Sequence, residues 1–302
     1  MSPALPKSEY YIRNDAITLI QGSDSLAVLD RLITTRIDDM QDLARRGALF
    51  CDYNGRISDL ASVFTISGSI LLSSAVSECD ETRRKLVDGR SWDEDCEIMV
   101  ADEAIFCISV FPNDFEQVKN IFGVDLEGSP PDILFESDEH LFVKSVTHNG
   151  IFFDILVKFE NLDNIISSLS KFGFSEMDSI GWNNARILLG LRQMCDSAGR
   201  LPDEIGFASL VSKDKGCYPG QEIHARLDSR GRKIKSLCRI TGDSPIDLGK
   251  HKTDDFGTIS ITSATYLDGI ASAFALIRLE GNSPESIDIK DSNYTIDVMG
   301  YP

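Results

Sequence analysis

The chain has 302 residues, of which 30 are basic and 48 acidic, so its formal net charge is −18. This length exceeds the commonest size of a single domain and predicts two or three domains. The negative charge argues against nucleic acid and against anionic membrane surfaces as partners. The first residues lack the apolar segment of a secretory signal, and no uncharged apolar run approaches the roughly 18 residues of a membrane span. We therefore expect a cytoplasmic protein that binds neither nucleic acid nor membranes.

Cysteine and histidine usage indicates neither a disulfide framework nor a metal site. The seven cysteines are an odd number, and no two of them have the C-x-x-C spacing of redox and zinc motifs. The four histidines are scattered along the chain. We expect reduced thiols and no bound metal.

Short apolar runs alternate with amphipathic segments as far as Gly190. The expected strands cover residues 16–21, 48–51, 57–66, 69–74, 97–101, 104–111, 141–147 and 151–157. The expected helices cover 26–32 after a cap at Ser23, then 78–89, 114–122, 162–172 and 179–189. Asn54-Gly55 between two apolar runs predicts a hairpin turn. The order lacks a βαβ rhythm, which predicts an α+β fold rather than a doubly wound sheet.

The character of the sequence changes at about residue 234. Helical periodicity ends there, and short strand-like runs follow, separated by turns. These runs cover residues 236–241, 257–263, 273–279 and 294–298. We expect a small antiparallel β-barrel or sandwich. The predicted domains are therefore residues 1–233 and residues 234–302.

The octet Lys215-Gly216-Cys217-Tyr218-Pro219-Gly220-Gln221-Glu222 places one cysteine in a glycine-bracketed turn before a helix. Pro219 suits the first helical position, because its missing N–H would be unpaired there. Cys217 would then lie at the positive end of the helix dipole, near Lys213, and its pKa should fall below the ordinary value. The alternative is a cysteine that merely packs in a turn, beside solvated lysines. A Cys217–His224 nucleophilic pair is disfavoured, because Pro219 makes a shared helix face doubtful.

The segment 213–235 reverses the charge of the chain. It holds seven lysines and arginines against three acidic residues, for a local charge of +4. An anionic small molecule is a natural partner for such an island. The alternative is a surface loop whose basic residues answer acidic neighbours elsewhere in the fold.

The octet resembles the K-G-C-Y-x-G-Q-E signature of the YgfZ family, the folate-binding relatives of the glycine-cleavage T protein, an aminomethyltransferase. The likeness extends over most of the chain. Its other pieces are Trp182 with Arg186 and Gly190, then Leu201-Pro202-Asp203-Glu204, the strand-like runs at 257–263 and 273–278, and the hairpin from Phe50 to Asp59.

This resemblance implies a fold and a function. The fold would pack α+β folate-binding subdomains around a central cavity, with a C-terminal barrel. The function would be that of a tetrahydrofolate-binding accessory factor that assembles or repairs iron–sulfur proteins, since the family includes a mitochondrial assembly factor. Its partners would be a reduced folate and iron–sulfur client or assembly proteins. Cys217 would carry the chemistry, with Lys215, Tyr218, Gln221 and Glu222 beside it. The alternatives are a folate-dependent one-carbon transferase and a cysteine hydrolase.

Four further residues are candidates for folate binding. In the T protein, the hairpin carries a catalytic aspartate in a G-G-I-x-D-D segment, and the similar run from Gly55 to Leu60 would put Asp59 in that place. Asp59 could equally be an outward residue of an edge strand. Asp154 is a second candidate for the acid that pairs with the pterin ring. Arg186 and Arg226 are the expected anion contacts.

Overall fold

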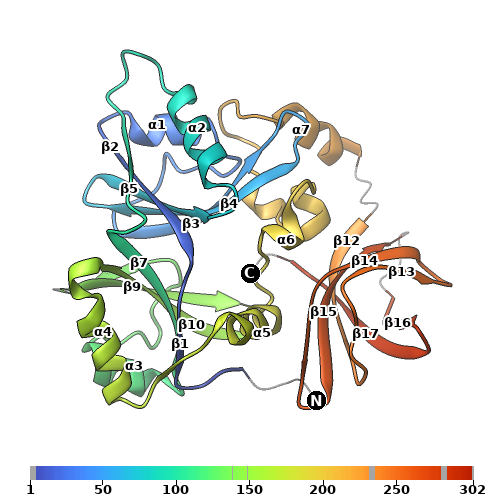
Figure 1. The fold of residues 1–302 in the computed structure, drawn as a ribbon. Coiled ribbons are helices and arrows are strands. Elements are labelled where there is room, and N and C mark those ends of the chain that lie inside the picture. Colours follow the sequence, from blue (N-terminus) through green and yellow to red (C-terminus); the bar gives the residue numbers. More distant parts are fainter. Residues whose placement is uncertain (1–4, 138, 148, 231–234, 280–283, 301–302) are drawn as a thin grey trace.

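The computed structural model describes residues 5–137, 139–147, 149–230, 235–279 and 284–300. Its strands form three sheets, which we call the N-terminal, middle and C-terminal sheets (Figure 1). In Figure 1 the first two lie one above the other, and the C-terminal sheet stands beside them.

The N-terminal sheet is antiparallel, with strand order β3-β4-β5-β2-β6. Its strands are β2 (Asp15–Gln21), β3 (Ala44–Cys51), β4 (Ile57–Ile66), β5 (Ser69–Ala75) and β6 (Glu97–Val100). Helices α1 (Ser25–Asp30) and α2 (Cys79–Gly89) cover one face. The β3–β4 pairing closes at Cys51 and Ile57, which confirms the hairpin predicted at Asn54-Gly55.

The middle sheet has strand order β11-β1-β7-β10-β9-β8. Its strands are β1 (Glu9–Ile12), β7 (Ile105–Phe111), β8 (Leu134–Glu136), β9 (His140–Thr147), β10 (Gly150–Lys158) and β11 (Ser175–Glu176). Helices α3 (Phe115–Phe122) and α4 (Phe159–Lys171) pack on one face through a large apolar core. On its other face, Val143 and Leu156 pack against Phe64 and Leu71 of the N-terminal sheet. The two sheets are therefore joined by an apolar layer.

The C-terminal sheet is a single antiparallel sheet, curled into a half-barrel, with order β13-β14-β15-β12-β17-β16. Its strands are β12 (Lys235–Gly242), β13 (Gly249–Thr253), β14 (Gly257–Leu267), β15 (Ile270–Arg278), β16 (Ser286–Ile289) and β17 (Ser292–Val298). The four predicted runs fall on β12, β14, β15 and β17. The boundary predicted between residues 233 and 234 lies outside the described residues.

A helical segment connects the middle and C-terminal sheets. It comprises α5 (Ser179–Leu189), α6 (Met194–Ser197), the 3-10 helices η1 (Pro202–Ile205) and η2 (Ala208–Leu210), and α7 (Gln221–Arg230). Asp178 caps α5 by accepting a hydrogen bond from the Gly181 amide, and Gly190 ends the helix at φ 84°. Both ends agree with the prediction, because the sequence carries a good cap and a left-handed terminator.

Two local predictions are wrong. The first helix begins at Ser25 rather than after a cap at Ser23, and it ends at Asp30. Pro219 lies in a turn, and α7 begins at Gln221. None of the helices in the described part of the chain is long and apolar enough to cross a membrane.

Candidate functional site

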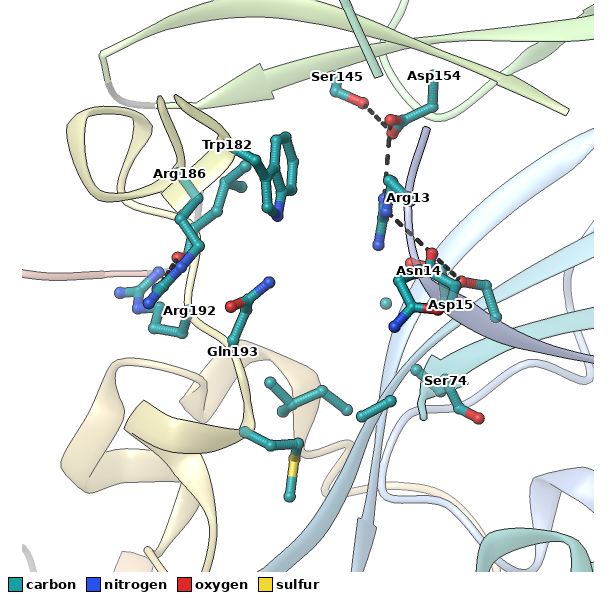
Figure 2. A pocket seen from close by; sticks show the side chains of 18 of the residues that line it. Arg13, Asn14, Asp15, Ser74, Ser145, Asp154, Trp182, Arg186, Arg192 and Gln193 are labelled. Carbon is teal, nitrogen blue, oxygen red and sulfur yellow. Dashed lines mark hydrogen bonds and ion pairs between the residues drawn. The ribbon is translucent and has the colours of Figure 1, made fainter. Parts of the chain in front are cut away.

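A cavity of about 620 Å³ lies between the N-terminal sheet, the middle sheet and the start of the helical segment. Figure 2 shows its two sides. Arg13 and Asp15, from the junction of β1 and β2, face Trp182 of α5 and Gln193 across the open space. A volume of this size is typical of small-molecule sites.

Asp154 of β10 anchors one wall. Its carboxylate is 1% exposed and accepts hydrogen bonds from the Ser109 and Ser145 hydroxyls at 2.7 and 3.0 Å. The Arg45 guanidinium donates to it at 2.8 Å, and Arg13 lies 3.7 Å away. Both carboxylate oxygens are therefore occupied by the protein, so Asp154 holds the arginines in place at the cavity wall.

Arg13 extends this network to the N-terminal sheet. Its guanidinium contacts Asp15 at 2.9 Å, and Asp15 accepts a hydrogen bond from the Ser73 hydroxyl at 2.7 Å. The side chain of Arg13 is about a quarter exposed, so it is available to an anion in the cavity. Sequence reasoning missed Arg13 and Asp15; the available signal was a charged break, Arg13-Asn14-Asp15, between two apolar runs.

The opposite wall presents an aromatic surface. Trp182 stacks on Tyr11, with ring centroids 5.0 Å apart and an interplanar angle of 7°. This pairing fixes the indole ring on the inner side of α5. The cavity therefore combines a flat aromatic group with polar and charged side chains.

The net charge of the cavity walls has the opposite sign to the net charge of the chain. Four arginines line it (Arg13, Arg45, Arg186 and Arg192), against three aspartates (Asp15, Asp132 and Asp154). The walls thus carry a charge of +1 in a protein of −18. Such a cavity favours an anionic ligand.

Asp59 does not face this cavity. Its carboxylate is fully buried under α2, where it accepts hydrogen bonds from the Thr82 hydroxyl at 2.5 Å and from the Leu60 and Ala75 amides. Burial raises its pKa to about 6. Because successive side chains of a strand point to opposite faces, the next residue, Leu60, lines the cavity instead. Its surroundings favour a structural role for Asp59, and a role in ligand binding stays a prediction.

Arg186 lines the cavity but is engaged by the protein. Its guanidinium forms a buried ion pair with Asp196 at 2.9 Å and donates to the Ser263 hydroxyl of β14 at 2.7 Å. It also donates to Asn183 and to the Leu191 carbonyl. Arg186 therefore ties α5 to α6 and to the C-terminal sheet, and its predicted anion contact would have to compete with these partners.

The octet lies outside this cavity, on the far side of η2. Lys215 is buried, and its ammonium is held by the backbone carbonyls of Asp30, Ile33 and Thr35 at 2.5 to 2.9 Å. Burial lowers its pKa. Three carbonyls match the three donors of an ammonium group. Lys215 thus fastens the octet to the segment after α1.

The beginning of α7 is fitted closely to the β3–β4 hairpin. Gly220 has φ 84°, and a Cβ added to it would lie 2.5 Å from the Cα of Gly55. His224 lies 2.7 Å from the Gly55 carbonyl through Nε2 and 3.2 Å from the Tyr218 hydroxyl through Nδ1. Figure 1 shows α7 beside the end of this hairpin. The glycine of the octet is therefore required by close backbone packing.

The remaining octet residues and the basic island are more exposed. Cys217 is exposed, as are Glu222 and Arg226. The Gln221 amide lies 3.5 Å from the carbonyls of Lys215 and Gly216. Lys213 pairs with Asp228 at 2.7 Å on the surface. No described residue between 213 and 230 lines the cavity between the sheets, so its positive charge comes from other parts of the chain.

The cavity residues fit a reduced folate. A pterin ring is flat and carries several hydrogen-bonding groups, which match Trp182, Asn14 and Asn183 on the walls. The carboxylates of a folate tail match Arg13 and Arg45. Among the described residues, no group of three histidine, cysteine or acidic side chains is placed to hold a metal ion.

The chain has the fold of aminomethyltransferase T. The glycine cleavage system aminomethyltransferase T from Bartonella henselae superposes with a TM-score of 0.81, over 96% of this chain and 84% of that chain, at 11% identity. A heterotetrameric sarcosine oxidase from Corynebacterium sp. U-96 matches 56% of this chain and 87% of that chain, with a TM-score of 0.41 and 12% identity. No protein-family model and no curated protein matches the sequence. The predicted fold type is confirmed, and the more specific YgfZ assignment stays a prediction.

Proposed function

We propose that the chain binds a reduced folate in the cavity between the first two sheets and acts as an accessory factor for iron–sulfur proteins. The observation that carries the folate part is the arginine-lined, aromatic cavity in a protein with the fold of aminomethyltransferase T. Trp182 would cover the pterin ring, and Arg13 with Arg45 would hold the carboxylates of the tail. A bound tetrahydrofolate would supply a carrier for one-carbon units.

A folate-dependent transferase is the second candidate, because the fold favours it. The hairpin argues against it. The T-protein segment G-G-I-x-D-D has two adjacent aspartates, and the second position is Leu60 here. Leu60 is the residue of that pair which lines the cavity, so β4 offers no acid to a bound folate there. This supports binding without aminomethyl transfer.

The accessory role is supported by the octet. Cys217 is exposed and separate from the cavity that would hold folate, so its thiol can meet a partner protein while the ligand stays bound. A cysteine hydrolase is disfavoured, because both ring nitrogens of His224 are engaged by Gly55 and Tyr218. His224 therefore does not serve Cys217 as a base.

The folate site is tested by calorimetric titration with tetrahydrofolate. Arg13→Gln removes a cavity charge and should weaken binding about tenfold, since charge-assisted hydrogen bonds are worth roughly 1.5–3 kcal/mol. Added salt should weaken wild-type binding as well. The control is Arg84→Gln, which removes an exposed arginine of α2 that pairs with Glu81. Wild-type protein that gives no heat with millimolar tetrahydrofolate would refute the proposal.

The choice between the two candidates is tested by a glycine-cleavage assay with the partner proteins of that system. We expect no aminomethyl transfer above background from protein that binds tetrahydrofolate in the titration. Turnover that depends on folate would instead establish the transferase.

The role of Cys217 is tested separately. Cys217→Ser should fold, bind tetrahydrofolate normally, and fail to restore iron–sulfur enzyme activity in cells that lack the factor. Cys79→Ser, at the start of α2, is the control and should restore it. Cys217 should also be alkylated at neutral pH faster than the other six cysteines. Full rescue by Cys217→Ser, with slow alkylation, would leave this residue as part of a turn.

A further inference from the structure

A second cavity, of about 610 Å³, lies between α7 and the 3-10 helices. It shares no lining residue with the first cavity, because η2 separates the two. Phe207 and Leu210 line the first cavity, whereas Ala208 and Val211 line the second. Its volume is again in the range of small-molecule sites. The function proposed above makes no use of it.

The lining of this second cavity combines apolar and neutral polar side chains. Pro202, Val211 and Leu227 are apolar, whereas Ser212, Tyr218 and Gln221 carry polar groups. An apolar body that carries a polar group would match this lining.

The hydrogen-bonding role of Tyr218 follows from its neighbours. The Gly55 carbonyl can only accept, so Nε2 of His224 carries the proton and donates to it at 2.7 Å. Nδ1 is then the acceptor of the neutral ring, and the Tyr218 hydroxyl donates to it at 3.2 Å. Burial lowers the pKa of His224 and raises that of Tyr218 to about 12, so both groups stay neutral. Among the residues that the structure describes, none donates a hydrogen bond to the tyrosine oxygen, so its lone pairs can accept one from a ligand.

The charges around the second cavity favour the same kind of ligand. Three carboxylates line it, against one ammonium group. They are Asp203, Glu204 and Asp228 against Lys213. The excess of two negative charges repels an anion and attracts a cation, which is the reverse of the first cavity.

We propose that the second cavity binds a small molecule with an apolar body and a protonated amine. The amine would donate to the Tyr218 oxygen and lie among the carboxylates, while the apolar body would cover Val211 and Leu227. The proposal does not depend on folate binding in the first cavity. It places a cation site beside the segment that carries Cys217, since Lys213 and Tyr218 on either side of that residue both line the cavity.

Three probes of one shape and different charge test this proposal: benzylamine, benzyl alcohol and benzoate. Their affinities for the full-length protein are measured by ligand-observed NMR titration, with and without tetrahydrofolate. We expect benzylamine to bind at least about tenfold more tightly than benzoate, with benzyl alcohol between them. Tetrahydrofolate should not displace benzylamine. Equal affinities, displacement by tetrahydrofolate, or no binding of any probe at 10 mM, the highest concentration of the titration and roughly 2.7 kcal/mol of affinity, would overturn the proposal.

A matched pair of variants locates the site. Ala208→Phe places a ring at the mouth of the second cavity, whereas Ser209→Phe places the same ring on the next residue, which does not line it. Both positions are exposed, so both variants should fold, which thermal melting checks. Loss of benzylamine binding in Ala208→Phe alone is the expected result. Loss in neither variant or in both would place the amine elsewhere and overturn the proposal.

Discussion

Asp59 and Asp154 are both fully buried aspartates in interior strands of a sheet, and different groups hold them. Asp154 is shared by two arginines and two serine hydroxyls. Asp59 accepts from one threonine hydroxyl and two backbone amides, and no cation in the described part of the chain hydrogen-bonds to it. The buried carboxylate of Asp154 at the cavity wall is thus balanced by two arginines, Arg13 and Arg45, which also line the cavity. A carboxylate under a helix is tolerated at the cost of a raised pKa.

The largest expected effect is at Asp154. Asp154→Asn leaves Arg13 and Arg45 beside each other without their shared carboxylate, and should lower the free energy of unfolding by roughly 3–5 kcal/mol. Asp132→Asn is the matched control, because Asp132 also pairs with Arg45 but is half exposed. The control should cost at most about 1 kcal/mol. Equal losses in urea denaturation would show that burial does not make the Asp154 ion pairs more important than the exposed Asp132 pair.

The next effect is a pH dependence at Asp59. Its pKa of about 6 lies above its ordinary value of 3.8, so the folded protein binds this proton more tightly than the unfolded chain. The contribution of Asp59 to the stability of the wild type therefore falls as pH rises from about 4 to about 6. Asp59→Asn should lack this fall and become more stable than the wild type by up to about 3 kcal/mol above pH 6. A stability difference between the variant and the wild type that stays the same at every pH would contradict the raised pKa of Asp59. Titration of this variant with tetrahydrofolate tests the predicted role of Asp59 in ligand binding, and an affinity equal to that of the wild type would refute that role.

The smallest expected effect is the loss of unfolding free energy when a single hydroxyl donor is removed. Thr82→Val removes the hydroxyl that reaches Asp59, and Ser109→Ala removes one of those that reach Asp154. We expect about 1–2 kcal/mol for Thr82→Val and less for Ser109→Ala, because the arginines still satisfy Asp154. Thermal unfolding of the two variants at pH 7 measures this. A larger cost for Ser109→Ala would mean that the arginines do not compensate.

The longer elements could be predicted from the sequence, because they carry both a hydrophobic pattern and end signals. Strands β1, β8, β11, β13 and β16 were missed, because each has only two to five residues and too few positions to show a period. The first three belong to the middle sheet and the other two to the C-terminal sheet.

The site was less predictable, for a physical reason visible in β4. Because side chains alternate along a strand, Asp59 and Leu60 face opposite sides of the sheet. Both sides are covered, however: α2 lies over one, and the other forms part of the cavity wall. The sequence therefore does not tell which of the two meets the ligand. Lys215 is similar: its charge predicts a surface residue or one that binds a ligand anion, whereas its partners are the Asp30 carboxylate and three backbone carbonyls some 180 residues earlier in the chain.

The attachment of Lys215 also has a consequence for the order of assembly. Its ammonium finds its acceptors only after the segment from Asp30 to Thr35 has taken its final course, and Gly220 finds its place only against a completed hairpin. Closing so long a loop is entropically costly, so these contacts should form late in folding. A truncated or still unfolded chain would then leave Cys217 on an unstructured loop. We therefore expect the octet to become ordered only after the N-terminal sheet has formed.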